Sequence, residues 1–547
     1  MTSLISPTDI QQAEIDEAAT LEPSTAPSPS SQPESLREPW GVLAALVLLG
    51  GISGIAYYLG FVRPYLLEQY FATPLLDLAK INNHTAPAAN EWAFTWLVVF
   101  ACYYIAFRLC PSGATVTRTF RRMALFLICG WAAFFAINLI FMYPVGAADI
   151  FDQIFRARLT AHYSFNPFTT LPSTLGSDPL QAYVAWKGDP SPYGPMWEAL
   201  AAGTSFLAGD SLWRNLILFK LLVSVAYGIS VALTYGILRA YKPDWALRGT
   251  LFYAWNPLVL FEVMGNGHND AIVVMFMLAG VYAFVLARRW AVLPALVAGA
   301  LTKFVPILLV PVAVAAIWRD RLPLIRSKRR RAPDDPPPTV TTYDRLTSLG
   351  IGAVISVGLG LVLYAPFWTG LSGILPRNRG NLFTVSIPKL VVDTLVRDMG
   401  VPEATAQFIV RNTAYALVGL IAVGLALWIL KARDATTPEE RDKLVGRTLS
   451  AFYEIIFAYL AIAALWFQPW YLMWLVALTA PLARIVNVHR TLLFCIGGVA
   501  NYFVWDFILL WNHSDPRSIQ IAAAIAVYTL PFLYTLYVWL RPRFSEL

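Results

Sequence analysis

Charged side chains are scarce in this chain of 547 residues: Asp, Glu, Lys and Arg make up only 14% of it, while 57% of the residues are hydrophobic. Soluble domains carry about 25% charged residues. This shortage excludes an ordinary soluble protein for every long stretch except residues 1–39. The composition therefore predicts an integral membrane protein, with the lipid bilayer as its main surroundings.

Cysteine and histidine are also rare, with four and five copies. The cysteines lie in or beside apolar segments without the spacing of a metal or redox site, so we interpret them as small hydrophobic side chains. The Cys and His content is too low for a zinc site. No cofactor is predicted with certainty, and a divalent cation bound by carboxylates is left open.

The basic residues give a net charge of +7, but they do not indicate nucleic acid. They cluster between hydrophobic runs instead of covering one soluble face. A membrane protein with basic loops explains this distribution better, and no nucleic-acid partner is predicted.

Residues 1–39 are rich in Ser, Pro, Thr and acidic residues and should form a disordered, acidic cytoplasmic tail. Residues 40–547 should form one transmembrane domain, because a helix needs about 20 apolar residues to cross a bilayer and many runs approach that length. The runs are 40–62, 92–109, 123–143, 214–238, 248–265, 270–287, 346–369, 412–431, 448–467, 470–483, 492–511 and 518–540.

The segment 290–317 is apolar but is interrupted by Lys303, Pro306 and Pro311, which favours a short helical hairpin. With it, we expect an all-α, polytopic helix bundle of about 12–14 spans.

Lys and Arg concentrate in alternate short loops, which indicates cytoplasmic loops of a plasma-membrane protein. They share one side only if 193–209 lies on the outer surface and 290–317 returns to its own side. Both termini and the basic loop 318–345 are then cytoplasmic. The loops 144–213 and 370–411 are then outside. Long ordered loops are usually functional, so we expect an extracytoplasmic active site, with interfacial helices in the first loop.

Two acids, Asp149 and Asp152, open the first outer loop. On a helix, residues three apart share one face, so both carboxylates would project together at the membrane surface. They could supply a general base or bind a divalent cation. The alternative is a simple helix start, where acids interact well with the dipole.

Four basic residues could contact a phosphate. Arg156 and Arg158 follow the acids and could clamp a phosphate or anchor to headgroups. Lys220 lies inside the fourth span and Lys303 inside the predicted hairpin. An ionisable group within a membrane is costly, which suggests function, although snorkelling to the surface is the alternative.

Two turns bring further polar and aromatic residues to the outer side. Glu262 lies near the end of a span, and the turn after it presents a histidine, an amide and a carboxylate; Asp270 could also be a helix cap. The second turn offers aromatic faces that could stack on sugars or form a membrane belt. The candidate residues of the two turns are Glu262, His268, Asn269, Asp270, Gln468, Trp470 and Tyr471.

These motifs together resemble the GT-C-type polytopic membrane glycosyltransferases that use polyprenyl-phosphate sugars, in particular the bacterial mannosyltransferase-like branch. They occur in the order of that family over about residues 120–475. The chain departs from the family pattern in having two extra spans before the first large outer loop. The matching motifs are Asp149-Ile-Phe-Asp152, Arg156-Ala-Arg158, Asn166-Pro-Phe168, Tyr193-Gly-Pro-Met-Trp197, Trp255-Asn-Pro257, Gly267-His-Asn-Asp270, Lys303-Phe-Val-Pro306 and Gln468-Pro-Trp-Tyr471.

The resemblance implies transfer of a hexose, of the mannose type in this branch, from a polyprenyl-phosphate donor to a hydroxyl of a glycan or glycolipid acceptor, with inversion. It implies that Asp149, or as second choice Asp152, is the base. The departing lipid phosphate would be stabilised by Lys220, Arg158, Lys303 or His268, because negative charge develops there.

Two other interpretations compete with an enzyme. A lipid or sugar-lipid transporter or flippase would also place ionisable residues in the membrane, but it predicts internal repeats with matching broken helices, which the sequence does not show. A non-catalytic membrane subunit would leave the acid pair unexplained.

Overall fold

The computed structural model describes residues 38–83, 85–113, 115–322, 340–370, 383–508 and 516–544. Within these ranges the regular elements are all helices, with isolated bridges but no strand, which confirms the predicted all-α polytopic fold. The predicted disordered tail lies outside the described residues except for its last two positions. Parts of the predicted loops 318–345 and 370–411 also lie outside them.

Nine helices in the described part of the chain are long and apolar enough to cross a membrane. Several of these helices begin before the predicted apolar run, because the polar residues that precede the run are also helical. They are α2 (Trp40–Tyr57, continued to Val62), α5 (Ala86–Leu109), α6 (Arg118–Ile140), α9 (Leu212–Tyr241), α15 (Thr342–Tyr364), α17 (Glu403–Leu430), α18 (Pro438–Ala458), α20 (Ile485–Phe503) and α22 (Pro516–Phe544).

Shorter apolar helices fill the middle of the bundle, and they account for the predicted spans that do not reach full length. They are α10 (Ala246–Ala254), α11 (Pro257–Leu260), α12 (Asp270–Val285), α13 (Arg289–Ala300), α14 (Val310–Arg319) and α19 (Leu472–Leu482). Non-helical backbone is tolerated at membrane depth when protein surrounds it. The break at Asn256 illustrates this: it is fully buried, and its side chain accepts a hydrogen bond from Val259 N–H at 3.1 Å.

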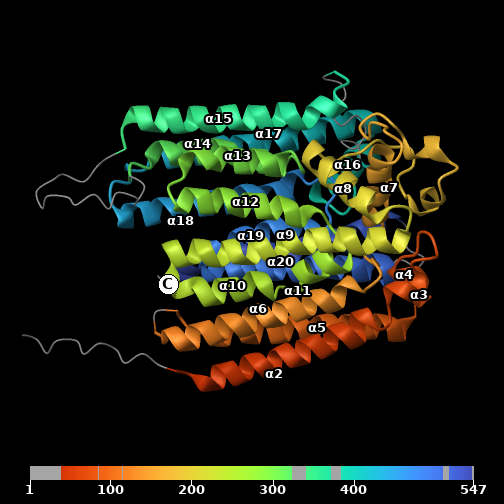
Figure 1. The fold of residues 1–547 in the computed structure, drawn as a ribbon, viewed down its shortest axis with the longest axis horizontal. Helices are drawn as coiled ribbons and strands as arrows, with labels where there is room; N and C mark the ends of the chain where they lie inside the picture. The colour runs from red at the N-terminus through yellow and green to blue at the C-terminus, as the bar shows by residue number, and fades with distance from the viewer. Residues whose placement is uncertain are drawn as a thin grey trace, which may run out of the picture.

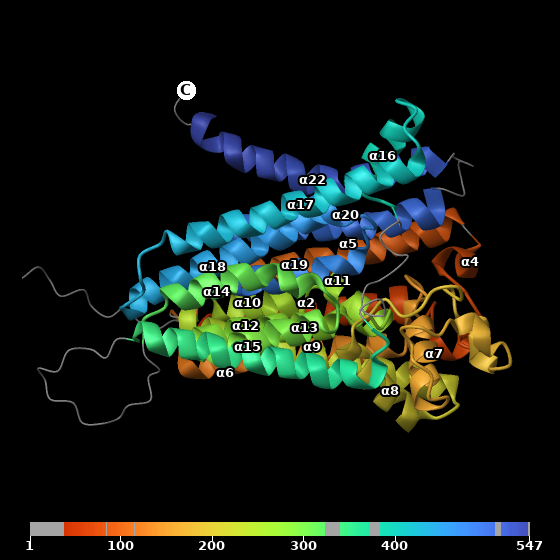
Figure 2. The same ribbon diagram turned by 90° about the horizontal axis from the view of Figure 1, so that it is seen from above.

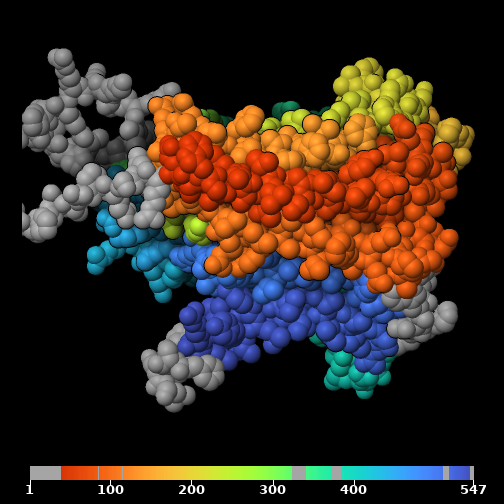
Figure 3. Space-filling view, turned by 90° about the horizontal axis from the view of Figure 1, so that it is seen from below, coloured from red at the N-terminus to blue at the C-terminus, as the bar shows by residue number. Residues whose placement is uncertain are grey.

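The outer helices present apolar side chains to their surroundings. Only 6% of the apolar window of α15 is buried inside the molecule, and Phe126, Val354 and Leu420 are exposed. The helix α2 runs along one face beside α5 and α6 (Figure 3). An apolar exterior of this kind is stable in lipid and not in water, so the chain is a multi-pass membrane protein.

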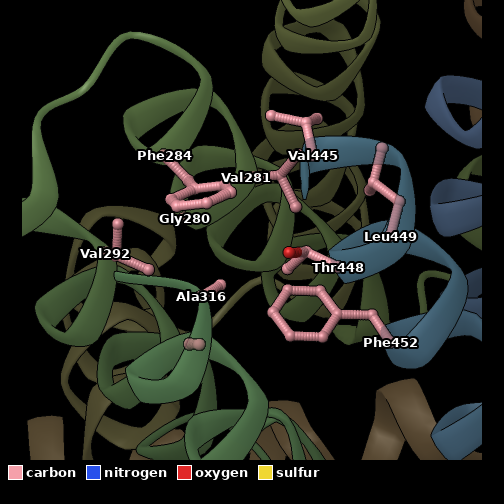
Figure 4. A pocket seen from close by; sticks show the side chains of 10 residues that line it. Gly280, Val281, Phe284, Val292, Ala316, Val445, Thr448, Leu449 and Phe452 are labelled. Carbon is pink, nitrogen blue, oxygen red and sulfur yellow. The ribbon is translucent and has the colours of Figure 1, made fainter. Parts of the chain in front are cut away.

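An apolar groove of about 330 Å³ lies between α5 and α20, lined by Trp92, Trp96 and Phe503 among others. A second, much smaller cavity lies inside the bundle where α12, α13, α14 and α18 meet (Figure 4). Its volume of about 10 Å³ would hold one water molecule at most. Its walls are apolar apart from Thr448, which donates to the Leu444 carbonyl, so it is a gap in the packing and not a binding site.

One end of the bundle carries the elements that do not cross it (Figures 1 and 2). These are α3 (Leu67–Tyr70), α4 (Leu78–Asn82), α7 (Asp149–Ala161), α8 (Pro195–Ala208) and α16 (Ile387–Arg397). We call this the loop end. The opposite end, where α15 and α18 begin, is called the basic end, because it contains Arg288, Arg289, Arg319, Arg321 and Arg441.

The segment predicted as a hairpin does double back: α13 and α14 pack together, with Lys303 in the turn between them. The turn meets the first loop, since Gly194 N–H donates to Thr302 O (2.9 Å) and Met196 N–H to Leu301 O (3.0 Å). The helix α8 packs on α7 and α9 at the loop end. The hairpin therefore supports the elements that carry the candidate site.

Gly194→Ala tests this junction. A Cβ at residue 194 would overlap the Leu301 carbonyl oxygen, and because both sides are backbone, we expect a loss of about 1–3 kcal/mol in stability. Thermal unfolding in detergent would report it as a lower Tm. The matched control is Gly203→Ala on α8, where a Cβ meets no atom within 4 Å and should not destabilise. Equal Tm values for the two variants would contradict the close contact.

Candidate active site

The first acid, Asp149, begins α7. The backbone just before it is fixed to the neighbouring turn, because Gly146 N–H donates to Asn266 Oδ1 (3.0 Å). Asp149 is half-buried, and among the described residues no hydrogen bond or ion pair to its carboxylate is present. It is therefore an acid held in place by the backbone and not by its own side chain.

The second acid, Asp152, has a different environment one turn later. Its carboxylate accepts hydrogen bonds from Ala185 N–H and Trp186 N–H, both at 3.1 Å, and lies 3.6 Å from the Arg156 guanidinium. Burial raises the pKa of Asp152 to about 6, against the opposing effect of Arg156. Asp152 thus joins α7 to the loop around residue 186.

The two arginines of the next motif also hold the loop. Arg156 donates to Asp189 O (2.6 Å) and Trp186 O (3.1 Å). Arg158 pairs with Asp178 (2.9 Å) and Asp210 (3.1 Å). Both guanidinium groups are buried, so their contacts are structural within the first loop.

A polar cluster lies beneath α7, where the turn after α11 ends. Glu262 is fully buried and accepts hydrogen bonds from Asn266 Nδ2 and Tyr502 Oη, both at 2.8 Å. His268 Nε2 lies 3.3 Å from Glu262 Oε2. The His268 ring stacks on Trp470, with 4.0 Å between the ring centres. The two turns identified in the sequence are therefore in direct contact.

Next to this cluster, the start of α12 is joined to the hairpin. Lys303 Nζ lies 2.5 Å from Asp270 Oδ2, and it lies 5.5 Å and 5.6 Å from the ring centres of Tyr193 and Tyr471. Tyr193 Oη in turn accepts from Gln153 Nε2 (3.1 Å) on α7. Lys303 thus contacts three segments: the start of α12 at Asp270, the first loop at Tyr193 and the turn at Tyr471.

Lys220 is separate from this group. Its side chain is fully buried, and its ammonium donates to the carbonyls of Ile140 (3.2 Å) and Met142. It therefore binds the carbonyl oxygens that the end of α6 leaves without helical partners. Gln468 is half-buried just before Trp470, and within the described residues its side chain has no hydrogen bond.

Several buried polar atoms near Lys303 have no hydrogen-bond partner among the described residues: both side-chain polar atoms of Asn269, Asp270 Oδ1, Trp470 Nε1 and Gln153 Oε1. Buried polar atoms normally have partners. Within the same described residues, no three His, Cys, Asp or Glu side chains form a group that could hold a metal ion.

The structure adds residues that were not among the predicted site residues, although Tyr193 belongs to one of the matching motifs. Gln153, Tyr193, Tyr502 and Glu198 all contact predicted site residues or their loop. Gln153 shares a face with Asp149, four residues away, which is a signal that helical spacing could have given. Glu198 was visible as an acid in an otherwise apolar helix, whereas Tyr502 is distant in sequence and gave no signal.

Residues 40–319 match the sequence profile of a protein family described as "Alpha-(1->6)-mannopyranosyltransferase, N-terminal domain". The chain is 26% identical over 308 residues to alpha-(1->6)-mannopyranosyltransferase A of Mycobacterium tuberculosis, covering 55% of this chain and 54% of that protein. It is 22% identical over 354 residues to alpha-(1->6)-mannopyranosyltransferase A of Corynebacterium glutamicum, covering 62% and 68%. The chain thus spans about half the length of the Mycobacterium tuberculosis relative it matches.

Glu198 generates a pH prediction. Burial raises the pKa of this carboxyl from 4.5 to about 7, although Ser191 and Arg156 oppose the shift. Because the folded pKa lies above the unfolded one, the protonated form favours folding. Its contribution is complete below pH 4.5 and is lost as the pH rises from 4.5 through about 7. The total loss is about 3 kcal/mol.

Glu198→Gln should remove this dependence, since an amide stays neutral. Thermal unfolding at pH 5 and pH 8 would measure it: the fall in Tm should be smaller in the variant than in the wild type. Glu439→Gln, at the basic end and exposed, is the control and should follow the wild type. A variant whose Tm falls as steeply as that of the wild type would be evidence against the raised pKa.

Proposed function

Because the chain belongs to the alpha-(1->6)-mannopyranosyltransferase family, we propose that it transfers mannose from a polyprenyl-phosphate donor to a hydroxyl of a glycan or glycolipid acceptor. The membership confirms the resemblance predicted from the ordered motifs. The catalytic part of the proposal rests on a contrast between the two acids. The carboxylate of Asp149 has no hydrogen bond or ion pair among the described residues, whereas that of Asp152 is bound to the loop.

Asp149 is the general base in this proposal. A base must be reachable by the acceptor and must have oxygen atoms that are not already occupied. Asp149 is half-buried at the loop end, so its carboxylate can take the proton of the acceptor hydroxyl while that oxygen attacks the anomeric carbon. The bond to the donor phosphate breaks on the opposite face, and the configuration inverts. Asp152 then has a positioning role, through Ala185 and Trp186.

Lys303 is the cation that stabilises the departing phosphate. It retains partial exposure, with 16% of its side chain accessible, and it is held by Asp270 on one side and by two tyrosine rings on the others. A cation fixed in advance near developing negative charge lowers the barrier without reorganisation. Lys220 is enclosed by carbonyl oxygens, and His268 is stacked on Trp470 beside Glu262.

The sugar hydroxyls are recognised by the buried polar atoms around Lys303. Asn269, Asp270 and Trp470 supply donors and acceptors that have no partner among the described residues. A hexose carries several hydroxyl groups that can donate and accept, so it suits such a set better than an apolar ligand.

The donor reaches this site from the bilayer. The apolar groove between α5 and α20 is floored by Trp92 and Trp96, whose rings lie 5.5 Å and 5.0 Å from the ring of Phe261. Phe261 directly precedes Glu262. The groove would place a lipid chain close to the polar cluster.

By the positive-inside rule the basic end is cytoplasmic, and the loop end, with the active site, is extracytoplasmic.

Asp149→Asn should lower mannose transfer by at least a hundredfold, since general-base catalysis contributes about 10²–10⁴. The measurement is transfer of labelled mannose from polyprenyl-phosphate mannose to an α-(1→6)-linked mannoside. Asp210→Asn, whose carboxylate is 89% exposed, is the control. Transfer by Asp149→Asn at the wild-type rate would rule out Asp149 as the general base.

Asp152→Asn should reduce Tm more than Asp149→Asn does, because two backbone N–H groups lose their charged acceptor.

Lys303→Met and Lys220→Met should separate the two lysines. The first should lower kcat per folded molecule by about two orders of magnitude, as removal of one donor to a developing anion does. It should also lower Tm, because it leaves the buried carboxylate of Asp270 without its partner. The second should lower Tm, since it leaves the carbonyls of Ile140 and Met142 unpaired, while the rate per folded molecule stays near that of the wild type. The reverse pattern would assign the phosphate to Lys220.

A further inference from the structure

A pocket whose lining includes two arginines and one aspartate lies at the basic end, at the opposite end of the bundle from the candidate active site. Its volume is about 580 Å³, within the range of about 300–1,000 Å³ that is usual for ligand pockets. It lies where the turn between α12 and α13 meets the first turn of α18 and the last turn of α9. Its lining residues are Ala240, Val285, Leu286, Ala287, Arg288, Trp290, Leu322, Pro438, Arg441 and Asp442.

The charge of this basic pocket is set by Arg288. Arg441 already pairs with the buried Asp320 at 3.3 Å, and Arg289 pairs with Asp320 at 2.8 Å. Arg288 is exposed, and its guanidinium has no hydrogen bond or ion pair to any described residue. Asp442 is the acidic residue of the lining and is also exposed. A cation therefore remains available to a ligand.

The start of α13 points to an anion independently. Arg288 is the N-cap residue and Arg289 is the first helical residue, with no side chain of the described residues capping this end. Cations at a helix N-terminus are unfavourable, because the dipole is positive there. Of these two arginines only Arg289 has an ion pair with a described acid, the one with Asp320. An anion in the pocket would compensate Arg288 and would be favoured by the positive end of the helix dipole.

The position of the pocket favours a lipid over a soluble anion. Ala240 lies at the last turn of the span α9, and Pro438 at the first residue of the span α18, so the pocket is at the level of the membrane surface. Trp290 lines it and is 44% exposed, as is usual for tryptophan at an interface. Val285 and Leu286 add apolar wall on which an acyl chain can rest.

We propose that this pocket binds the phosphate headgroup of an anionic phospholipid, with Arg288 as the main contact and the N-terminus of α13 beside it. Basic pockets between helices at the membrane surface bind such headgroups. The site is separate from sugar transfer and does not depend on which side of the membrane the basic end faces.

The test is native mass spectrometry and thermal unfolding of the purified full-length protein in detergent, with phosphatidylglycerol added. We expect saturable binding and a higher Tm. Phosphatidylcholine with the same acyl chains should bind more weakly. Arg288→Gln should weaken phosphatidylglycerol binding about fivefold, as expected for one arginine at a membrane surface. The matched control is Arg433→Gln, an exposed arginine at the same end that does not line the pocket.

Ala240→Glu is the second variant, in case Arg288→Gln disturbs the turn. It places a negative charge on an exposed helical position of the pocket wall, so it should weaken phosphatidylglycerol binding without affecting the free protein. Glycerol phosphate and inorganic phosphate, at the same concentrations, should not compete. Effective competition by either would overturn the lipid as the ligand. Wild-type binding by both pocket variants, or equal binding of the two lipids, would overturn the site.

Discussion

The ion pair between Lys303 and Asp270 is the interaction on which the geometry of the loop end depends. The carboxylate side chain is fully buried, and the lysine is mostly so. Removing one partner of a buried pair leaves an uncompensated charge, which costs far more than the pair contributes. The pair fixes the hairpin turn against the start of α12, and the tyrosine rings beside Lys303 bring in the first loop and the turn at Gln468. Four segments that are distant in sequence therefore share one centre.

The two acids at the start of α7 show how a folded loop separates residues that helical spacing treats as equivalent. The spacing places Asp149 and Asp152 on one face, and both are in the first turn of the helix. The path of the loop then brings two backbone N–H groups, 33 and 34 residues further on, to Asp152. The proposal of Asp149 as base rests on this difference in contacts.

The sequence predicted the membrane helices, the hairpin at Lys303 and the clustering of the motifs, because these depend on local hydrophobicity and on the alternation of basic loops. It did not predict the partners of individual side chains. Lys220 appeared equivalent to Lys303, since both are lysines within apolar runs, yet Lys220 meets carbonyls of the end of α6 some 80 residues earlier. The alternative of snorkelling to the surface is wrong for Lys220, because its side chain is fully buried. Such contacts depend on helix register across the bundle, which hydrophobic pattern alone does not determine.

The central helices that fall short of a full span are what allow polar chemistry at membrane depth. A continuous helix satisfies its own backbone and presents only side chains, whereas the breaks at Asn256 and after Glu262 place turns with polar residues inside the protein. Those turns are tolerated because α2, α5, α6 and α20 surround them with apolar surface. The outer helices thus present apolar side chains to the lipid, and the inner, broken helices carry Glu262, His268 and Asp270. The same division explains why the loops of the loop end pack on the turns of the inner helices: the buried polar groups of those turns lie within reach of the membrane surface at that end.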